Sequence, residues 1–75
     1  PARGMTAIDF TLERKSWVLL TISDILGRRI ATLIEGECEA GRKSVQFTTK
    51  NLPAGIYLYS LTAGGRTETR TMVIR

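Results

Sequence analysis

The chain has 75 residues but no histidine, and its only cysteine is Cys38. Without histidine it offers neither an imidazole general base nor a histidine metal cluster, and a single cysteine cannot form a disulfide within the chain. No run approaches the roughly 20 apolar residues that a membrane-spanning helix needs. These absences exclude most classes of enzyme, so we expect a non-catalytic module with no cofactor, no metal site and no membrane span.

The net charge of +4 comes mostly from arginine. Basic pairs stand at Arg14-Lys15, Arg28-Arg29 and Arg42-Lys43, each beside a predicted turn. A nucleic-acid-binding surface would instead gather its positive charges along one groove or helix, with aromatic residues between them. We therefore expect no nucleic acid as a partner, and we interpret the charges as a solvated surface.

The periodicity of the apolar residues is that of strands, and no stretch has a helical period. Ile8, Phe10 and Leu12 alternate with polar residues, as expected of a half-buried strand. The same alternation and the turn signals between runs predict six strands, over Thr6–Leu12, Trp17–Ser23, Arg28–Glu35, Lys43–Thr49, Gly55–Ala63 and Arg66–Ile74. The spacing of apolar residues in the third strand breaks the alternation and indicates a bulge. Residues 36–42, which lie between two glycines, are predicted to form a loop.

Gly64 and Gly65 give the strongest hairpin signal, since consecutive glycines accept the positive φ values of a two-residue primed turn. If Ala63 faces Arg66, Tyr59 lies opposite Arg70. An arginine opposite a tyrosine that faces the core leaves two alternatives. Either Arg70 extends over the ring to reach water, or a bulge shifts the register by one residue.

Six strands in 75 residues predict a single domain over residues 1–75. The predicted fold is all-β, a small immunoglobulin-like or fibronectin-like antiparallel sandwich of six to seven strands. In such sandwiches a tyrosine near the start of the penultimate strand returns its hydroxyl to the backbone upstream. Tyr57 has that position, so we expect it to act as a structural clip, with Leu52 filling the core beneath it.

Other candidate residues for chemistry have simpler interpretations. Trp17 could stack on a sugar, but we expect it to cover one end of the core. Cys38 lies between two glutamates, which discourage its thiolate, so we expect an unreactive thiol. Glu35, Glu37 and Glu39 could bind calcium, but they lack the usual Asp and Asn partners and are expected to form a solvated loop.

Several short motifs resemble a known family. They are a D-x-x-G-R turn at Asp24, Gly27 and Arg28, a lone glycine at Gly41, an L-x-x-G-x-Y segment at Leu52, Gly55 and Tyr57, the Gly64-Gly65 hairpin, and the basic and apolar end "RTMVIR". Together they make the chain similar to the C-terminal sorting domain of proteins exported by the type IX secretion system. That family is itself similar to the immunoglobulin-like domain of the flagellar hook-capping protein. Its members usually open with an Asn-Pro pair, whereas this chain starts at Pro1.

The resemblance implies a C-terminal address for a larger cargo on the same chain. The type IX machinery at the outer membrane would read it, and the cargo would pass through the periplasm to the cell surface or the medium. We expect the last strand to offer its backbone for strand addition. Its side chains Arg70, Met72, Ile74 and Arg75 would supply selectivity, and the turn at Asp24, Gly27 and Arg28 is a second candidate for recognition.

Two alternatives remain open at the level of sequence. One is a non-catalytic spacer or assembly module, as in the hook-capping relative. The other is a carbohydrate-binding module, which would need an exposed aromatic face.

Overall fold

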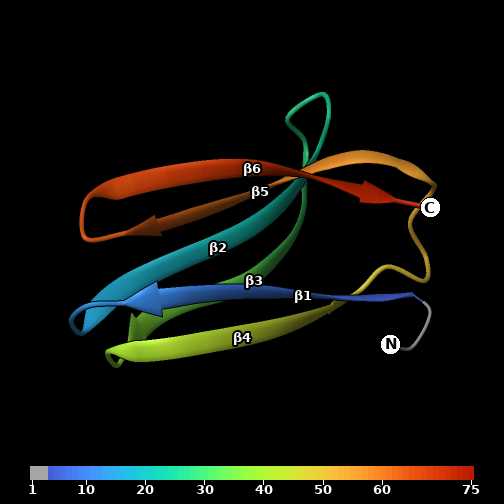
Figure 1. The fold of residues 1–75 in the computed structure, drawn as a ribbon. Coiled ribbons are helices and arrows are strands. Elements are labelled where there is room, and N and C mark those ends of the chain that lie inside the picture. Colours follow the sequence, from blue (N-terminus) through green and yellow to red (C-terminus); the bar gives the residue numbers. More distant parts are fainter. Residues whose placement is uncertain (1–3) are drawn as a thin grey trace.

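The computed structural model describes residues 4–75, and Pro1 lies outside the described residues. The described residues form six strands, β1 (Met5–Leu12), β2 (Ser16–Asp24), β3 (Arg29–Cys38), β4 (Gly41–Thr48), β5 (Gly55–Ala63) and β6 (Arg66–Ile74). All pairings are antiparallel. One sheet has the order β3-β2-β5-β6, and β1 and β4 form a second, two-stranded sheet that faces it (Figure 1). The prediction of a small all-β sandwich is confirmed.

The core lies between the two sheets and is centred on β2. Val18, Leu20 and Ile22 are fully buried, because alternate residues of this strand point inward. Ile8 of β1 and Phe47 of β4 pack on Leu20 and Ile22 from the opposite sheet. These are the inward positions that the alternation of apolar residues predicted.

The prediction of a loop over residues 36–42 is wrong. β3 continues to Cys38 and β4 begins at Gly41, so the connection is much shorter. Gly36 lies within β3 and pairs with Val18 of β2. The pairing of β3 with β2, which carries the fully buried Val18, Leu20 and Ile22, outweighs the local preference of glycine for turns.

The irregular spacing in β3 does correspond to bulges. The register between β2 and β3 shifts at two places, so Leu33 and Ile30 have no partner in the ladder while their neighbours pair with β2. Each bulge adds one residue on β3 and bends the strand locally. The predicted bulge is confirmed, and Ile30 is 39% exposed as a result.

The hairpin of β5 and β6 has the unshifted register. Ala63 pairs with Arg66 across Gly64 and Gly65, whose φ angles are 58° and 77°. Tyr59 therefore lies opposite Arg70. Of the two alternatives, the first is correct, because the side chain of Arg70 extends to water. Arg70 is exposed, and its guanidinium lies 3.6 Å from the carboxylate of Glu68.

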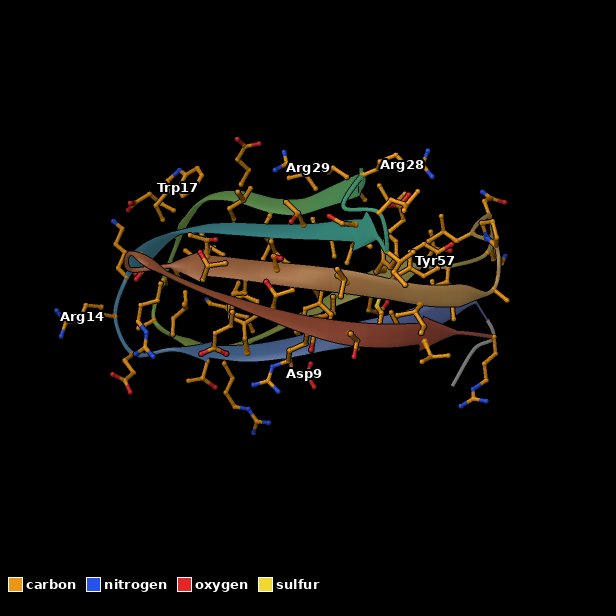
Figure 2. All side chains as sticks on the ribbon, turned by 90° about the horizontal axis from the view of Figure 1, so that it is seen from above. Asp9, Arg14, Trp17, Arg28, Arg29 and Tyr57 are labelled. Atoms are coloured by element: carbon orange, nitrogen blue, oxygen red, sulfur yellow. The ribbon has the colours of Figure 1, made fainter. Side chains whose placement is uncertain are left out.

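Trp17 does not cover the core, so that prediction is wrong. Because Val18 points inward, the preceding side chain points away from the core, and Trp17 is 48% exposed. Its partner across the sheet is Glu37 of β3. Figure 2 shows Trp17 and Arg14 toward one end of the sheet, and Arg28 and Tyr57 toward the other.

Candidate functional site

Motifs that are far apart in the sequence meet at one end of the four-stranded sheet. Asp24, the last residue of β2, pairs with Tyr57 of β5, and Gly55 of β5 pairs with Ile74 of β6. The D-x-x-G-R turn, the L-x-x-G-x-Y segment and the end of β6 therefore lie next to one another (Figures 1 and 2). We call this the motif end of the sandwich. Gly41, Gly64 and Gly65 lie at the opposite end. Gly41 begins β4, just after the connection that crosses from one sheet to the other, and Gly64 and Gly65 form the turn of the β5–β6 hairpin.

The D-x-x-G-R turn is built around the Asp24 carboxylate. Oδ1 accepts hydrogen bonds from the backbone N–H groups of Leu26 and Arg28, both at 2.9 Å, and Oδ2 accepts one from Arg28 Nε at 2.8 Å. The backbone N–H of Gly27 donates to Asp24 O, and the N–H of Asp24 donates to Arg28 O. Gly27 has a φ of 85°, which glycine adopts without strain. Each residue of the motif thus has a physical role in one stiff turn.

These contacts also determine the charge of Asp24. The hydrogen bond from the backbone N–H of Arg28 is the largest cause that lowers the pKa of Asp24 below its ordinary value. The guanidinium of Arg28 and the N–H of Leu26 act in the same direction, while loss of hydration opposes them. The carboxylate therefore stays ionised to a lower pH than that of an isolated aspartate, and the turn keeps its acceptor.

The L-x-x-G-x-Y segment anchors the crossing from β4 to β5. Tyr57 is buried at 6% exposure, and its hydroxyl donates a hydrogen bond of 2.7 Å to the carbonyl of Pro53. Leu52 packs against the core from the same segment. This is the arrangement expected of a tyrosine that clips the chain between the sheets.

Replacement of Tyr57 by phenylalanine is expected to lower the free energy of unfolding by about 0.5–1.5 kcal/mol, because the ring stays and one hydrogen bond is lost. Denaturant midpoints would measure it. The matched control is Tyr59→Phe, since the Tyr59 hydroxyl has no described hydrogen bond within residues 4–75. Equal stability of the Tyr57→Phe variant and the parent chain would show that this hydroxyl does not hold the crossing.

Between the two motifs lies an open hollow of about 380 Å³. Its walls come from the Asp24 turn, from the start of β3 and from residues 52–57. Ile25 and Leu26 at the tip of the turn are 67% and 74% exposed, and Ile30 and Ile56 are also exposed. The motifs alone did not identify these four side chains as a surface. The signal in the sequence was a pair of large aliphatic residues inside a tight turn, where polar residues are usual.

The four candidate recognition residues of β6 differ in exposure. Ile74 is 8% exposed and Met72 packs against the core, so these two side chains mainly hold the strand on the sandwich. Arg70 and Arg75 are exposed. Arg70 lies halfway along β6, whereas Arg75 follows the strand at the motif end.

Two of the acidic residues near β3, and the cysteine, make local contacts. Lys15 Nζ lies 3.7 Å from Glu37 and 3.9 Å from Glu39, and all three side chains are exposed. Cys38 is half-buried, with its Sγ 3.9 Å from the carbonyl of Gly36. Within residues 4–75 there is no group of three or more His, Cys, Asp or Glu side chains placed to hold a metal ion, and no helix that could cross a membrane.

Comparison with known proteins identifies the family whose motifs meet at this end of the sandwich. The family model described as "Secretion system C-terminal sorting domain" matches residues 1–75. No curated protein and no solved structure matches the chain. Domains of this family are sorting signals that direct cargo proteins through the type IX secretion system to the cell surface or the medium, and they are in general non-catalytic. A sorting role implies the type IX machinery as partner and a cargo upstream on the same chain, and the spacer alternative is not favoured. The chain belongs to the family of type IX secretion C-terminal sorting domains.

Proposed function

We propose that residues 1–75 act as one non-catalytic sorting domain, and that the type IX machinery reads it along β6. The family gives the sorting role, and the single hydrophobic core supports one folding unit. The observation that carries the proposal is the position of β6, which is the last strand of its sheet and, within residues 4–75, pairs with β5 alone. An edge strand offers unpaired backbone groups to a strand of a partner.

The geometry of the β5–β6 hairpin indicates which backbone N–H and C=O groups of β6 do not bond to β5. In a two-residue hairpin, the residues that flank the turn exchange both of their hydrogen bonds, and the pairs then alternate along the ladder. Since Ala63 and Arg66 flank the turn, the alternate residues of β6 from Arg66 onward bond to β5. The N–H and C=O groups of the others point away from the sheet, namely those of Thr67, Thr69, Thr71 and Val73.

Arg70 and Arg75 are the charged side chains that would give this edge its selectivity. Arg70 makes only a surface ion pair with Glu68, which contributes little to stability, so its guanidinium remains able to bind a carboxylate of a partner. Met72 and Ile74 support the proposal indirectly, because their burial holds the strand in place.

The test replaces Arg70 and Arg75 by glutamine in a passenger protein that carries residues 1–75 at its C-terminus. Export in a type IX-competent host is expected to fall about tenfold or more, since each charge-assisted hydrogen bond lost costs about 1.5–3 kcal/mol. Denaturant midpoints of the purified domain should stay close to those of the parent, because both arginines are exposed.

The matched control replaces Arg14 and Arg42 by glutamine. Both are exposed and neither lies on β6, so export is expected to remain normal. Undiminished export of the Arg70 and Arg75 variant would contradict their role and would leave the backbone of β6 or the Asp24 turn as the feature that is read.

A further inference from the structure

Large apolar side chains are exposed mainly at the motif end of the sandwich. Of the seven that are exposed among residues 4–75, Trp17 lies toward the opposite end, and Met5 lies on β1 in the two-stranded sheet. The other five form what we call the apolar end patch, Ile25, Leu26, Ile30, Ile56 and Val73. The first four line the same hollow, and Val73 pairs with Ile56 across β5 and β6, so the two lie on the same face.

The fold does not need these side chains in their exposed positions. Ile25 and Leu26 stand at the tip of a turn whose hydrogen bonds all involve Asp24, Gly27, Arg28 and the backbone of Leu26. Polar residues at the tip would keep every one of those bonds. Contiguous apolar surface on a small protein usually marks an interaction site, and a stiff turn presents it with little loss of entropy on binding.

The charges around the patch are mainly positive. Arg29 begins β3 beside it and Arg75 follows Val73 by two residues, and both are exposed. Arg28, which precedes β3, is also exposed, but its charge is paired with that of Asp24. Among residues 4–75 the only acidic side chain at this end is that of Asp24, whose carboxylate is already bound within its turn. The other acids lie on β1, in the β1–β2 turn, in the second half of β3 and just beyond it, and in the first half of β6. A partner surface that fits is therefore apolar at its centre with carboxylates at its rim.

We infer that the apolar end patch docks on a protein of the export machinery that presents an apolar socket rimmed by acidic side chains. The inference rests on the sorting role and adds a second contact to the edge of β6. The two contacts are continuous, because Val73 belongs to the patch and its backbone also lies on the free edge. A partner strand along β6 would thus end beside the patch.

The experiment replaces Ile25 by threonine and Leu26 by glutamine in the same passenger fusion. Both residues are more than half exposed, so the folded domain should keep its denaturant midpoint, while export is expected to fall about tenfold or more as the apolar contact is lost. The control is Trp17→Gln, which removes an exposed apolar side chain at the opposite end and should leave export normal.

Charge reversal tests the acidic rim. Arg29→Glu should lower export several-fold, whereas Arg14→Glu, at the other end of the sheet, should leave it unchanged (Figure 2). Equal export of the two charge variants would overturn the proposal that acidic side chains surround the socket.

The remaining outcomes separate the proposals. Retention of the passenger with the unmodified domain would contradict the sorting role itself. If the unmodified fusion and the folded Ile25 and Leu26 variant are both exported normally, the proposed role of the patch is overturned and the sorting role stands. We expect the purified domain not to float with vesicles of phosphatidylethanolamine and phosphatidylglycerol. If the parent domain floats with the vesicles and the Ile25 and Leu26 double variant does not, the patch binds a lipid surface. That result would overturn the proposal of a protein partner.

Discussion

A chain that ends at Thr69 is expected to lose its folded structure. The truncation removes Ile74, which is 8% exposed, and Met72, which packs against the core, together with five backbone pairs between β6 and β5. Burial of one such side chain contributes about 1.5–3 kcal/mol. A domain of this size has a total stability of roughly 4–11 kcal/mol, so the two side chains and the lost ladder account for much of it.

Far-ultraviolet circular dichroism and denaturant unfolding of the truncated domain would measure this effect. The matched control ends at Ile74 and lacks only the exposed Arg75, so it should unfold at nearly the parent midpoint. A cooperative transition of the Thr69 truncation near that midpoint would show that β6 is dispensable for the fold. The expected unfolding also means that a truncated passenger cannot by itself separate recognition from stability, which is why the arginine variants are needed.

Leu20→Ala is expected to lower the free energy of unfolding by about 2–5 kcal/mol. Leu20 is fully buried in the central strand β2 and contacts the core residues of both sheets, so the shorter side chain leaves a cavity that the neighbours fill only in part. For a domain of this size the loss corresponds to a fall in Tm of roughly 10–30 °C.

The same chemical change at Leu26 is the control. Leu26 is 74% exposed at the tip of the Asp24 turn, and Leu26→Ala should change the free energy of unfolding by less than about 0.5 kcal/mol. Thermal and denaturant unfolding of the two variants would compare them directly. Equal losses at the two positions would contradict the placement of the core on β2.

Much of the fold could be predicted because the alternation of apolar residues is a local property. Val18, Leu20 and Ile22 stand at alternate positions of one strand, and the Gly64-Gly65 hairpin determines the register of its two strands. The errors arose where tertiary pairing overrides local preference. Gly36 is a turn signal by composition, yet it lies in a strand because β2 pairs along the whole of β3. Trp17 is apolar, yet the direction of Val18 places it on the outer face.

The candidate site was predictable only in its parts. The D-x-x-G-R and L-x-x-G-x-Y motifs could be read from the sequence, since each is a local turn or crossing with its own hydrogen bonds. Their meeting depends on the antiparallel pairing of Asp24 with Tyr57, which joins residues 33 positions apart in the chain. For the exposure of Ile25 and Leu26 the sequence holds only one signal, two aliphatic residues inside a tight turn, and single exposed apolar residues are common on protein surfaces. The signal therefore did not show that these side chains lie beside Ile56.

The sorting role can be measured most directly with one passenger protein that carries residues 1–75 at its C-terminus. The fusion would be expressed with a periplasmic export signal in a type IX-competent host and in a host that lacks the type IX system. We predict that the passenger reaches the cell surface or the medium of the competent host and stays in the periplasm of the deficient one. Retention in the periplasm of both hosts, with the domain folded, would contradict the account.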